Sequence, residues 1–371
     1  MNMEKEEDKT GTTSVDVSHG AEASSTQQSD VTKQNEAILS ERIAHQIAEK
    51  QASSVESIQH QIKSISSSAI TSMCVVDKDR IAVGTEDGAI LICDKLLTTV
   101  KPLAHHKSAI HQLEMYKDCV VSASHAGRIK VWNLETGECL RRIKPQGVSG
   151  PIFQFFIQGD VIFFAVHCGK SPVFKYSLAS GELLACSVVK LKHVKGVVAI
   201  LSEGEEQLLV SCPKGLQMFG FSSQTPTPVA VLQKKALKAK RMEIVDDQLG
   251  LLMKSKKGLD WFFAEVCLRD MMLTRITQIT RRKKHVRVGK NLSSLSGDGA
   301  NWFVCDSCGM LVIAANATAT PFLIPGECKH PFTCGLVDED YVFFGTAKGE
   351  IEVEKKREKV EAEEDMEVAY L

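Results

Sequence analysis

The sequence predicts an all-β fold, a seven-bladed β-propeller of four-stranded antiparallel blades. Two observations carry this prediction. From about residue 56 to residue 354 the chain is a succession of short Val-, Ile-, Leu- and Phe-rich runs broken by Gly, Asp, Asn and Lys, without long helical periodicity. In the same region, turn glycines recur at a spacing close to 40–45 residues, which is the period of a propeller blade.

The repeat is clearest in two consecutive segments. Residues 81–94 contain an apolar run, a turn around Gly88 and a second apolar run, and residues 120–133 repeat the pattern around Gly127, 39 residues later. Turn glycines or their equivalents follow at separations of 42, 46, 43, 51 and 40 residues, at Gly169, Gly215, Gly258, Gly309 and Gly349. Further runs flank these pairs, such as 110–115, 139–143, 183–189 and 333–337. Seven units of four strands fit one closed ring, in which each blade covers its neighbour.

The two ends of the chain differ from this repeat. Residues 1–52 are predicted to be a disordered, acidic and polar extension, because the first 32 residues bury too little apolar surface to offset chain entropy. Within the extension, residues 33–51 are predicted to form an amphipathic helix, with Leu39, Ile43 and Ile47 on one stripe. Residues 53–354 would form the propeller. Residues 355–371 are predicted to be an acidic tail.

Residues 55–65 allow two interpretations. Residues 57–63 alternate apolar and polar side chains, so they can supply the outer strand of the last blade, whose other strands would be 332–337, 341–346 and 350–354. Alternatively, Val55, Ile58, Ile62 and Ile65 step by three, four and three residues and extend the upstream helix as a coiled coil. We favour the strand.

Composition excludes several classes of protein. The 45 basic and 46 acidic residues leave a net charge of −1, which excludes a globally basic nucleic-acid coat. No apolar run approaches ~20 residues, and the acidic N-terminus lacks the apolar segment of a secretory signal. Most of the twelve cysteines lie in apolar runs, which favours reduced core thiols. We therefore expect a protein of the cytoplasm or nucleus, the nucleolus included, that is not secreted.

Residues 103–143 carry the motifs of a known repeat. They include Leu103-Ala104-His105-His106, Ser122-Ala123-Ser124, the run from Gly127 to Asn133 and Thr136-Gly137-Glu138. This segment closely resembles a WD-repeat blade, and residues 66–102 and the last blade resemble one as well. Ala126 stands where the family's turn Asp is expected, so the resemblance implies an incomplete His–Ser–Asp–Trp hydrogen-bond network in this blade.

The resemblance implies a non-catalytic scaffold without a cofactor, acting as an assembly platform for other proteins of a larger complex. A rigid ring with loops on two faces holds partners with little loss of ordering entropy. The helix could dock in a partner's groove. The predicted partner contacts are Leu39, Ile43 and Ile47 of the helix and the loop residues His105, His125, Lys170 and Lys214.

A basic sector supports an alternative function, an RNA- or ribosome-associated propeller. Residues 234–290 hold sixteen basic and six acidic residues, a net charge of +10 that would attract a polyanion. Aromatic residues do not interleave with the basic runs, so base stacking is not indicated. The predicted polyanion contacts are Lys254, Lys256, Lys257, Arg281, Arg282, Lys283 and Lys284.

One motif is a candidate for metal binding. Cys305 and Cys308, in a Cys-x-x-Cys-Gly pattern, could bind zinc together with Cys328, His330 or Cys334. The repeat spacing instead predicts that Cys305 to Gly309 is the hairpin turn of the sixth blade, and we favour the turn. No catalytic, metal or cofactor site is predicted.

Overall fold

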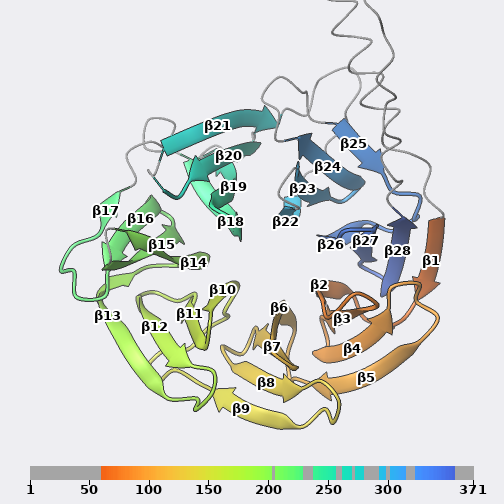
Figure 1. Ribbon diagram of the computed structural model, residues 1–371, viewed down its shortest axis with the longest axis horizontal. Helices are drawn as coiled ribbons and strands as arrows, with labels where there is room; N and C mark the ends of the chain where they lie inside the picture. The colour runs from red at the N-terminus through yellow and green to blue at the C-terminus, as the bar shows by residue number, and fades with distance from the viewer. Residues whose placement is uncertain are drawn as a thin grey trace, which may run out of the picture. The chain divides into compact units, whose positions relative to one another are not determined.

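The structure, a computed structural model, describes residues 60–202, 205–228, 237–255, 261–269, 272–279, 292–297, 301–314 and 322–355. These residues form seven four-stranded antiparallel sheets arranged as blades around an axis (Figure 1). The prediction of an all-β, seven-bladed propeller is thereby confirmed, and the described residues contain no helix. The predicted helix at 33–51 and the acidic tail beyond Lys355 lie outside the described residues.

Within each blade we letter the strands A to D from the centre of the ring outward. Blade 1 is β2 (Ile70–Val75), β3 (Arg80–Thr85), β4 (Ala89–Asp94) and β5 (Val100–His105); blade 2 is β6 (Ile110–Tyr116), β7 (Cys119–Ser124), β8 (Ile129–Asn133) and β9 (Cys139–Ile143). Blade 3 is β10 (Phe155–Gln158), β11 (Val161–Ala165), β12 (Ser171–Ser177) and β13 (Leu183–Leu191); blade 4 is β14 (Gly196–Ser202), β15 (Glu205–Cys212), β16 (Gly215–Gly220) and β17 (Thr227–Pro228). Blade 5 is β18 (Leu237–Val245), β19 (Gln248–Ser255), β20 (Trp261–Cys267) and β21 (Met272–Ile279); blade 6 is β22 (Leu292–Gly297), β23 (Asn301–Asp306), β24 (Gly309–Ala314) and β25 (Phe322–Pro325). Blade 7 is β26 (Phe332–Val337), β27 (Tyr341–Thr346), β28 (Glu350–Lys355) and β1 (His60–Ser64).

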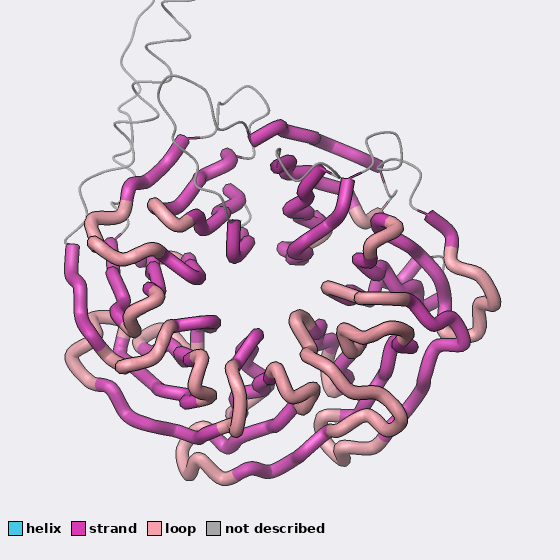
Figure 2. The backbone as a smooth tube through the Cα atoms, turned by 180° about the vertical axis from the view of Figure 1, so that it is seen from behind, coloured by secondary structure: helices cyan, strands magenta, loops and turns pink. Residues whose placement is uncertain are grey.

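The antiparallel register sorts the connections onto two faces of the ring. Ile110 at the start of an A strand pairs with Ser124 at the end of the B strand, and Ala89 at the start of a C strand pairs with His105 at the end of the D strand. The B-to-C turns and the D-to-A connections between blades therefore lie on one side, which we call the BC face. Figure 2 shows the ring from behind, with these connections as pink loops between the strands.

The turn glycines predicted from the repeat all join B and C strands, apart from Gly258, which lies outside the described residues. Gly88 and Gly349 show why glycine is needed there, because their φ angles of 100° and 79° belong to the left-handed region that side chains disfavour. A Cβ at Gly349 would also lie 2.0 Å from the carbonyl oxygen of Ser66.

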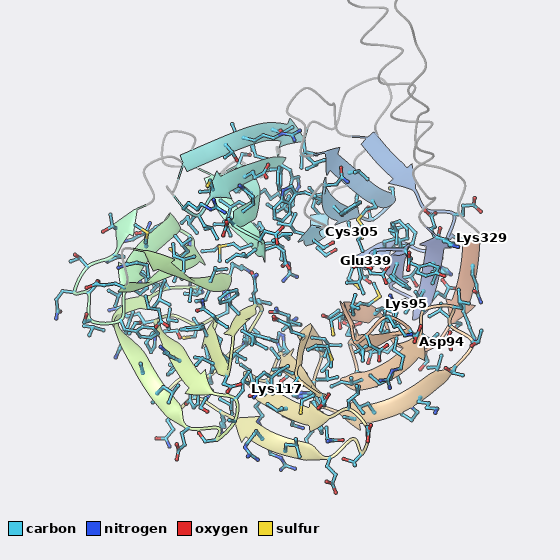
Figure 3. The ribbon with its side chains drawn as sticks, in the orientation of Figure 1. Asp94, Lys95, Lys117, Cys305, Lys329 and Glu339 are labelled. Carbon is cyan, nitrogen blue, oxygen red and sulfur yellow. The ribbon has the colours of Figure 1, made fainter. Side chains whose placement is uncertain are left out.

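The ring closes by pairing strands from both ends of the propeller sequence. β1 runs antiparallel to β28, with Ile62 opposite Glu352. The strand interpretation is confirmed and the coiled-coil alternative is wrong for residues 60–64; β1 ends at Ser64, one residue beyond the predicted end, and residues 57–59 lie outside the described residues. A second link crosses the same boundary, because Lys95 of blade 1, which is labelled in Figure 3, forms an ion pair of 2.6 Å with Asp338 of blade 7. Both side chains are at most 9% exposed.

Apolar side chains of neighbouring blades form the core. Val121 and Ile129 of blade 2 pack with Phe155 and Phe164 of blade 3, all of them buried. Burying a large apolar side chain contributes about 1.5–3 kcal/mol, and no blade could cover both of its faces alone. Side chain–backbone hydrogen bonds also join neighbouring blades. Three of them link innermost strands, in which Leu113 N donates to Ser72 Oγ (3.0 Å), Phe155 N to Gln112 Oε1 (2.6 Å) and Gly335 N to Ser294 Oγ (2.9 Å). In a fourth, Ser211 Oγ of the B strand β15 donates to Ala239 O of β18 (2.7 Å).

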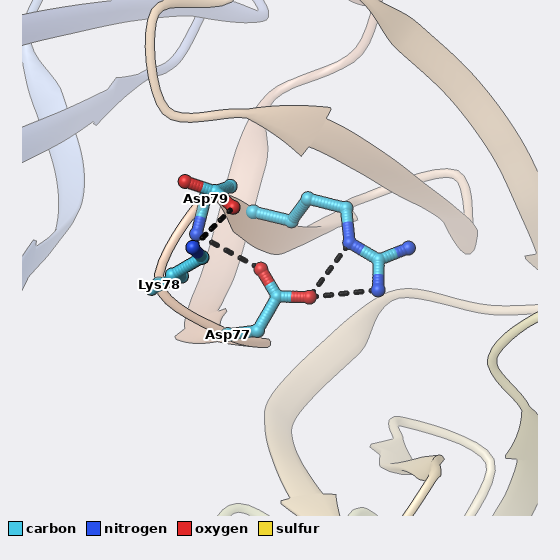
Figure 4. Close-up of polar contacts among 4 residues, drawn as sticks. Asp77, Lys78 and Asp79 are labelled. Atoms are coloured by element: carbon cyan, nitrogen blue, oxygen red, sulfur yellow. Dashed lines mark hydrogen bonds and ion pairs between the residues drawn. The ribbon is translucent and has the colours of Figure 1, made fainter.

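The A-to-B turn of blade 1 shows how the opposite face is built. Asp77 accepts the backbone N–H of Asp79 at 2.9 Å, which forms an Asx turn, and its other oxygen lies 2.8 and 2.7 Å from two guanidinium nitrogens of Arg80 (Figure 4). Lys78 at the tip of this turn is 88% exposed. Asp338 repeats the turn in blade 7, where it accepts the N–H groups of Asp340 and Tyr341.

All twelve cysteines are free. The prediction that most of them are core thiols is wrong, because only Cys93, Cys212, Cys305 and Cys334 are buried and the others are half-buried or exposed. β23 ends at Asp306, which pairs with Gly309 at the start of β24 across a tight turn, so the favoured hairpin is confirmed at this motif. Among the residues that the structure describes, no helix is long and apolar enough to cross a bilayer.

Candidate functional site

The predicted loop contacts lie on the BC face. His105 ends β5, His125 lies in the β7–β8 turn, Lys170 precedes β12, and Lys214 lies in the β15–β16 turn. All four side chains are exposed. They nonetheless come from four different blades, so the structure brings them to one face without bringing them into one cluster.

Of the other predicted contact residues, the structure describes only Lys254. Lys254 lies near the end of β19, on the BC face, with its Nζ 4.9 Å from the centre of the Trp261 ring. The remaining predicted contacts lie outside the described residues, namely Leu39, Ile43, Ile47, Lys256, Lys257, Arg281, Arg282, Lys283 and Lys284.

A row of five rings crosses the BC face over blades 2 to 4. His125 Nδ1 lies 3.1 Å from His111 Nε2, and the His111 ring is followed by those of Phe153, His167 and His193. Successive centroids along the row are 5.3, 4.8, 4.9 and 5.2 Å apart. We call these five residues the histidine arc. His125 and His193 at its ends are exposed, and the three inner rings are half-buried.

Local backbone geometry positions the arc. Phe153 lies in the connection from blade 2 to blade 3, and the backbone N–H of His167 donates to Pro151 O at 2.8 Å. Gly150 makes this approach possible, because its φ is 142° and a Cβ there would lie 2.6 Å from His167 O. On the far side, His167 Nδ1 lies 2.9 Å from Val194 O, which holds the ring next to His193.

Positive charges lie beside the arc, and its two inner histidines have lowered pKa values. Lys195 Nζ lies 4.3 Å from the centre of the Phe153 ring, and an Arg241 guanidinium nitrogen donates to Phe153 O at 3.4 Å. Burial, followed by the charges of His125, Arg241 and Lys195, lowers the pKa of His111 to about 4. Burial also lowers the pKa of His167. At neutral pH His111 and His167 are therefore neutral imidazoles, and with the Phe153 ring they lie near the cations Lys195 and Arg241.

Beneath the arc, the A strands of the blades enclose a central cavity of about 280 Å³. Three ionisable groups that the sequence analysis did not single out line it: Glu114 of β6 and Arg241 and Glu243 of β18. Burial, followed by the charge of Glu243, raises the pKa of Glu114 to about 8. Burial raises the pKa of Glu243 to about 7, although Arg241 opposes the shift. Ionised carboxylates are thus disfavoured in the cavity.

Replacing Glu114 by Gln is expected to stabilise the ring at alkaline pH. A glutamate whose pKa is raised on folding costs stability as pH rises from its ordinary value near 4.5 towards 8, and an uncharged amide avoids this cost. Because part of the side chain remains accessible, we expect a gain of about 2 kcal/mol at pH 8.5, or about 4 °C in Tm, and none at pH 4.5. Thermal unfolding at the two pH values measures the difference; an equal change at both would contradict it.

Blade 2 retains most of the network that the WD-repeat resemblance implies. His106 Nε2 lies 2.6 Å from Ser122 Oγ, and Trp132 Nε1 donates to the same oxygen at 2.8 Å. All three side chains are buried, and the His106 and Trp132 rings meet edge to face at 5.6 Å. The bonds form without the Asp that Ala126 replaces.

No group of three or more His, Cys, Asp or Glu side chains is placed to hold a metal ion within the described ranges. Cys305 is buried and Cys308 exposed, at opposite ends of their turn. The Cys328 thiol instead lies 3.1 Å from Glu350 Oε2.

Comparisons with known proteins bear on the fold. No protein-family model and no curated protein matches the sequence. The WD40 β-propeller domain of Doa1 superimposes with a TM-score of 0.60 at 11% identity, over 81% of this chain and 98% of that chain. The chain has a WD40-like propeller fold. A computationally designed protein, Ika8, superimposes with a TM-score of 0.55 at 14% identity, over 81% of this chain and 99% of that chain. At these identities the likeness concerns the fold alone.

Sequence reasoning missed the residues that converge near the axis. Phe153, His167 and His193 belong to three separate connections, and only the ring places them side by side. A weak indication existed for Glu114, a carboxylate between the apolar residues Leu113 and Met115 of an A strand.

Proposed function

We propose that this protein is a non-catalytic interaction platform that binds another protein through its BC face. The observation that supports the proposal most directly is the histidine arc, a continuous row of rings across three blades with exposed ends. Aromatic side chains beside a cation are typical of the energetically dominant centre of a protein interface. The WD40-like fold agrees with this role, since rigid loops hold a partner at small entropic cost.

The arc favours a partner segment that presents both apolar and acidic side chains. The Phe153 ring is half-buried and lies next to the ammonium group of Lys195. An apolar side chain of the partner can therefore pack on the exposed part of the ring while a neighbouring carboxylate of the partner binds Lys195. We expect association to be steered by charge and therefore to weaken as salt concentration rises.

Substitution at the centre of the arc tests the proposal. The double variant Phe153→Ala, Lys195→Ala is expected to lose co-purifying protein partners, with affinity reduced by about 30-fold or more, since central contacts cost about 2 kcal/mol each. Affinity capture of the full-length tagged protein from its own cells, followed by quantitative mass spectrometry, measures the loss. Lys78→Ala on the opposite face is the matched control and should retain the partners. If both variants retain the same partners, the BC face is not the platform.

The RNA- or ribosome-associated alternative and the predicted location in cytoplasm or nucleus stay predictions. Most of the basic residues on which the alternative depends lie outside the described ranges, although Lys254 is on the BC face with the arc. Ribonuclease treatment before capture separates the two functions, because partners held through RNA would be lost after it.

A further inference from the structure

A second cavity, of about 400 Å³, opens on the BC face between blades 1 and 2. It lies beside the D-to-A connection that contains His106, the B-to-C turn of blade 2 and the end of β9. We call it the blade-2 pocket. Its ionisable lining consists entirely of potentially cationic side chains: His105, His106, Lys107, Arg128, Lys130, Arg142 and Lys144. No carboxylate belongs to the lining.

Among the residues that the structure describes, no carboxylate neutralises the charges in the blade-2 pocket. Lys130 and Arg142 are register partners on β8 and β9, and like charges directly opposite each other destabilise a sheet. Lys130 Nζ reaches only the carbonyl oxygen of His105, at 3.4 Å, and the face of Trp132, at 4.5 Å. Burial is the largest cause of the lowered pKa of Lys130, and the positive charges of Arg142, Arg128 and Lys107 lower it further. None of these cations has a carboxylate within ion-pair distance in the part of the chain that the structure describes.

The pocket also offers neutral donors. Ser108 Oγ accepts the backbone N–H of Ala126 at 3.1 Å, which leaves its hydroxyl hydrogen for a bound oxygen. Two arginines, three lysines and a serine hydroxyl match a dianion with several acceptor oxygens, because guanidinium groups bind such anions through two parallel hydrogen bonds. A bound dianion would remove the repulsion between Lys130 and Arg142.

We propose that the blade-2 pocket binds a phosphorylated serine or threonine on a protein partner. The proposal rests on the platform function. In it the partner makes two contacts: a segment without modification binds the histidine arc, and a phosphorylated residue binds the blade-2 pocket. The pocket is a bounded cavity rather than a stripe along which a nucleic-acid backbone could run. Its lining has no Phe, Tyr or Trp on which bases could stack, and no exposed large apolar residue to enter a lipid surface.

Peptide binding to the full-length protein tests the proposal. Two fluorescein-labelled degenerate peptide libraries, one centred on phosphoserine and the other on serine, are titrated with protein while fluorescence anisotropy is recorded. We expect the phosphoserine library to bind at least about tenfold more tightly, and the variant Arg128→Glu, Arg142→Glu to lose this preference, because hydrogen bonds to charged groups are worth about 1.5–3 kcal/mol. The control Lys190→Glu, Lys348→Glu makes the same change in net charge at two exposed lysines outside the pocket and should retain the preference.

The experiment also distinguishes a phosphopeptide from RNA and from a phospholipid as the ligand of the pocket. Equal binding of the two libraries would overturn the proposal. So would tighter binding of a uridine 20-mer RNA, or of phosphatidylcholine vesicles containing 5% phosphatidylinositol phosphate, if the pocket variant abolished that binding. The Phe153→Ala, Lys195→Ala variant should still prefer the phosphoserine library. If this variant loses its partners in cells but keeps the preference for phosphoserine, both proposed contacts are supported. If it keeps its partners, the arc proposal fails, and the peptide result still decides the proposal for the blade-2 pocket.

Discussion

Removing β1 is expected to open the ring and to cause the largest loss of stability that a short truncation can produce. A chain that begins at residue 65 lacks the five residues that pair with β28. At about 1 kcal/mol for each lost backbone hydrogen bond, the cost is about 5 kcal/mol, within a total stability of about 5–15 kcal/mol for a folded protein. The link from Lys63 to Leu97 O across the ring boundary is lost as well. Chemical denaturation followed by circular dichroism measures the change.

A chain that begins at residue 55 is the control for this truncation. It keeps β1, and the chain divides into two units between Ser54 and Val55, so we expect its stability to equal that of the full chain. The chain that begins at residue 65 should also aggregate, because it exposes the edge of β28 beside the buried residues Ile351 and Val353. Equal denaturation midpoints for all three chains would show that β1 does not close the ring.

The repeat could be predicted because its physical causes are local. A turn such as that at Gly88 needs a glycine at positive φ, and the runs on either side need β-branched side chains, so both leave a periodic trace in the sequence. Closure by residues 57–63 followed from a second local pattern, alternation, combined with a blade that lacked its fourth strand. The predicted strands of blade 7 accordingly agree with β26 and β27 at both ends and with β28 to within one residue.

The candidate site could not be predicted in the same way, because its residues meet only through the ring. His111 lies between His125 and Phe153 and lines the central cavity, a placement that arises only when the blades come together. The cations of the blade-2 pocket are likewise spread over three elements. Arg128 and Lys130 attracted notice only as part of a repeat motif, and their pairing with Arg142 depends on the register of β8 and β9. Counting charges along the chain pointed to the basic sector at 234–290 as the anion site and missed the blade-2 pocket. Such a count cannot show which charges face one cavity.

Ser122→Ala is expected to destabilise blade 2 by about 3 kcal/mol. Its Oγ–H has His106 Nε2 at 2.6 Å and Lys130 O only at 3.5 Å, so Nε2 accepts the hydrogen bond while Trp132 donates to the same oxygen. Removing the hydroxyl leaves two buried polar groups without a partner, and each costs about 1–3 kcal/mol. Ser124→Ala, in the same strand, loses one bond to Arg128 O and should cost about 1 kcal/mol. Urea denaturation compares the two variants, and equal costs would contradict the shared role of Ser122.

The same network predicts how stability depends on pH. Burial, followed by the charges of Lys130, His105 and Arg128, lowers the pKa of His106 to about 3. The unfolded chain therefore binds a proton at this residue near pH 6.5 while the folded protein does not, so the contribution of neutral His106 is complete above pH 6.5 and is lost as pH falls towards 3. The variant His106→Gln removes this titration. Its deficit in unfolding free energy relative to the wild type should shrink by about 2 kcal/mol between pH 6.5 and 4.5, because each pH unit is worth about 1.4 kcal/mol. His111 and the carboxylates titrate in both proteins and largely cancel, so a deficit that stayed constant over this range would mean that His106 is already protonated in the folded ring.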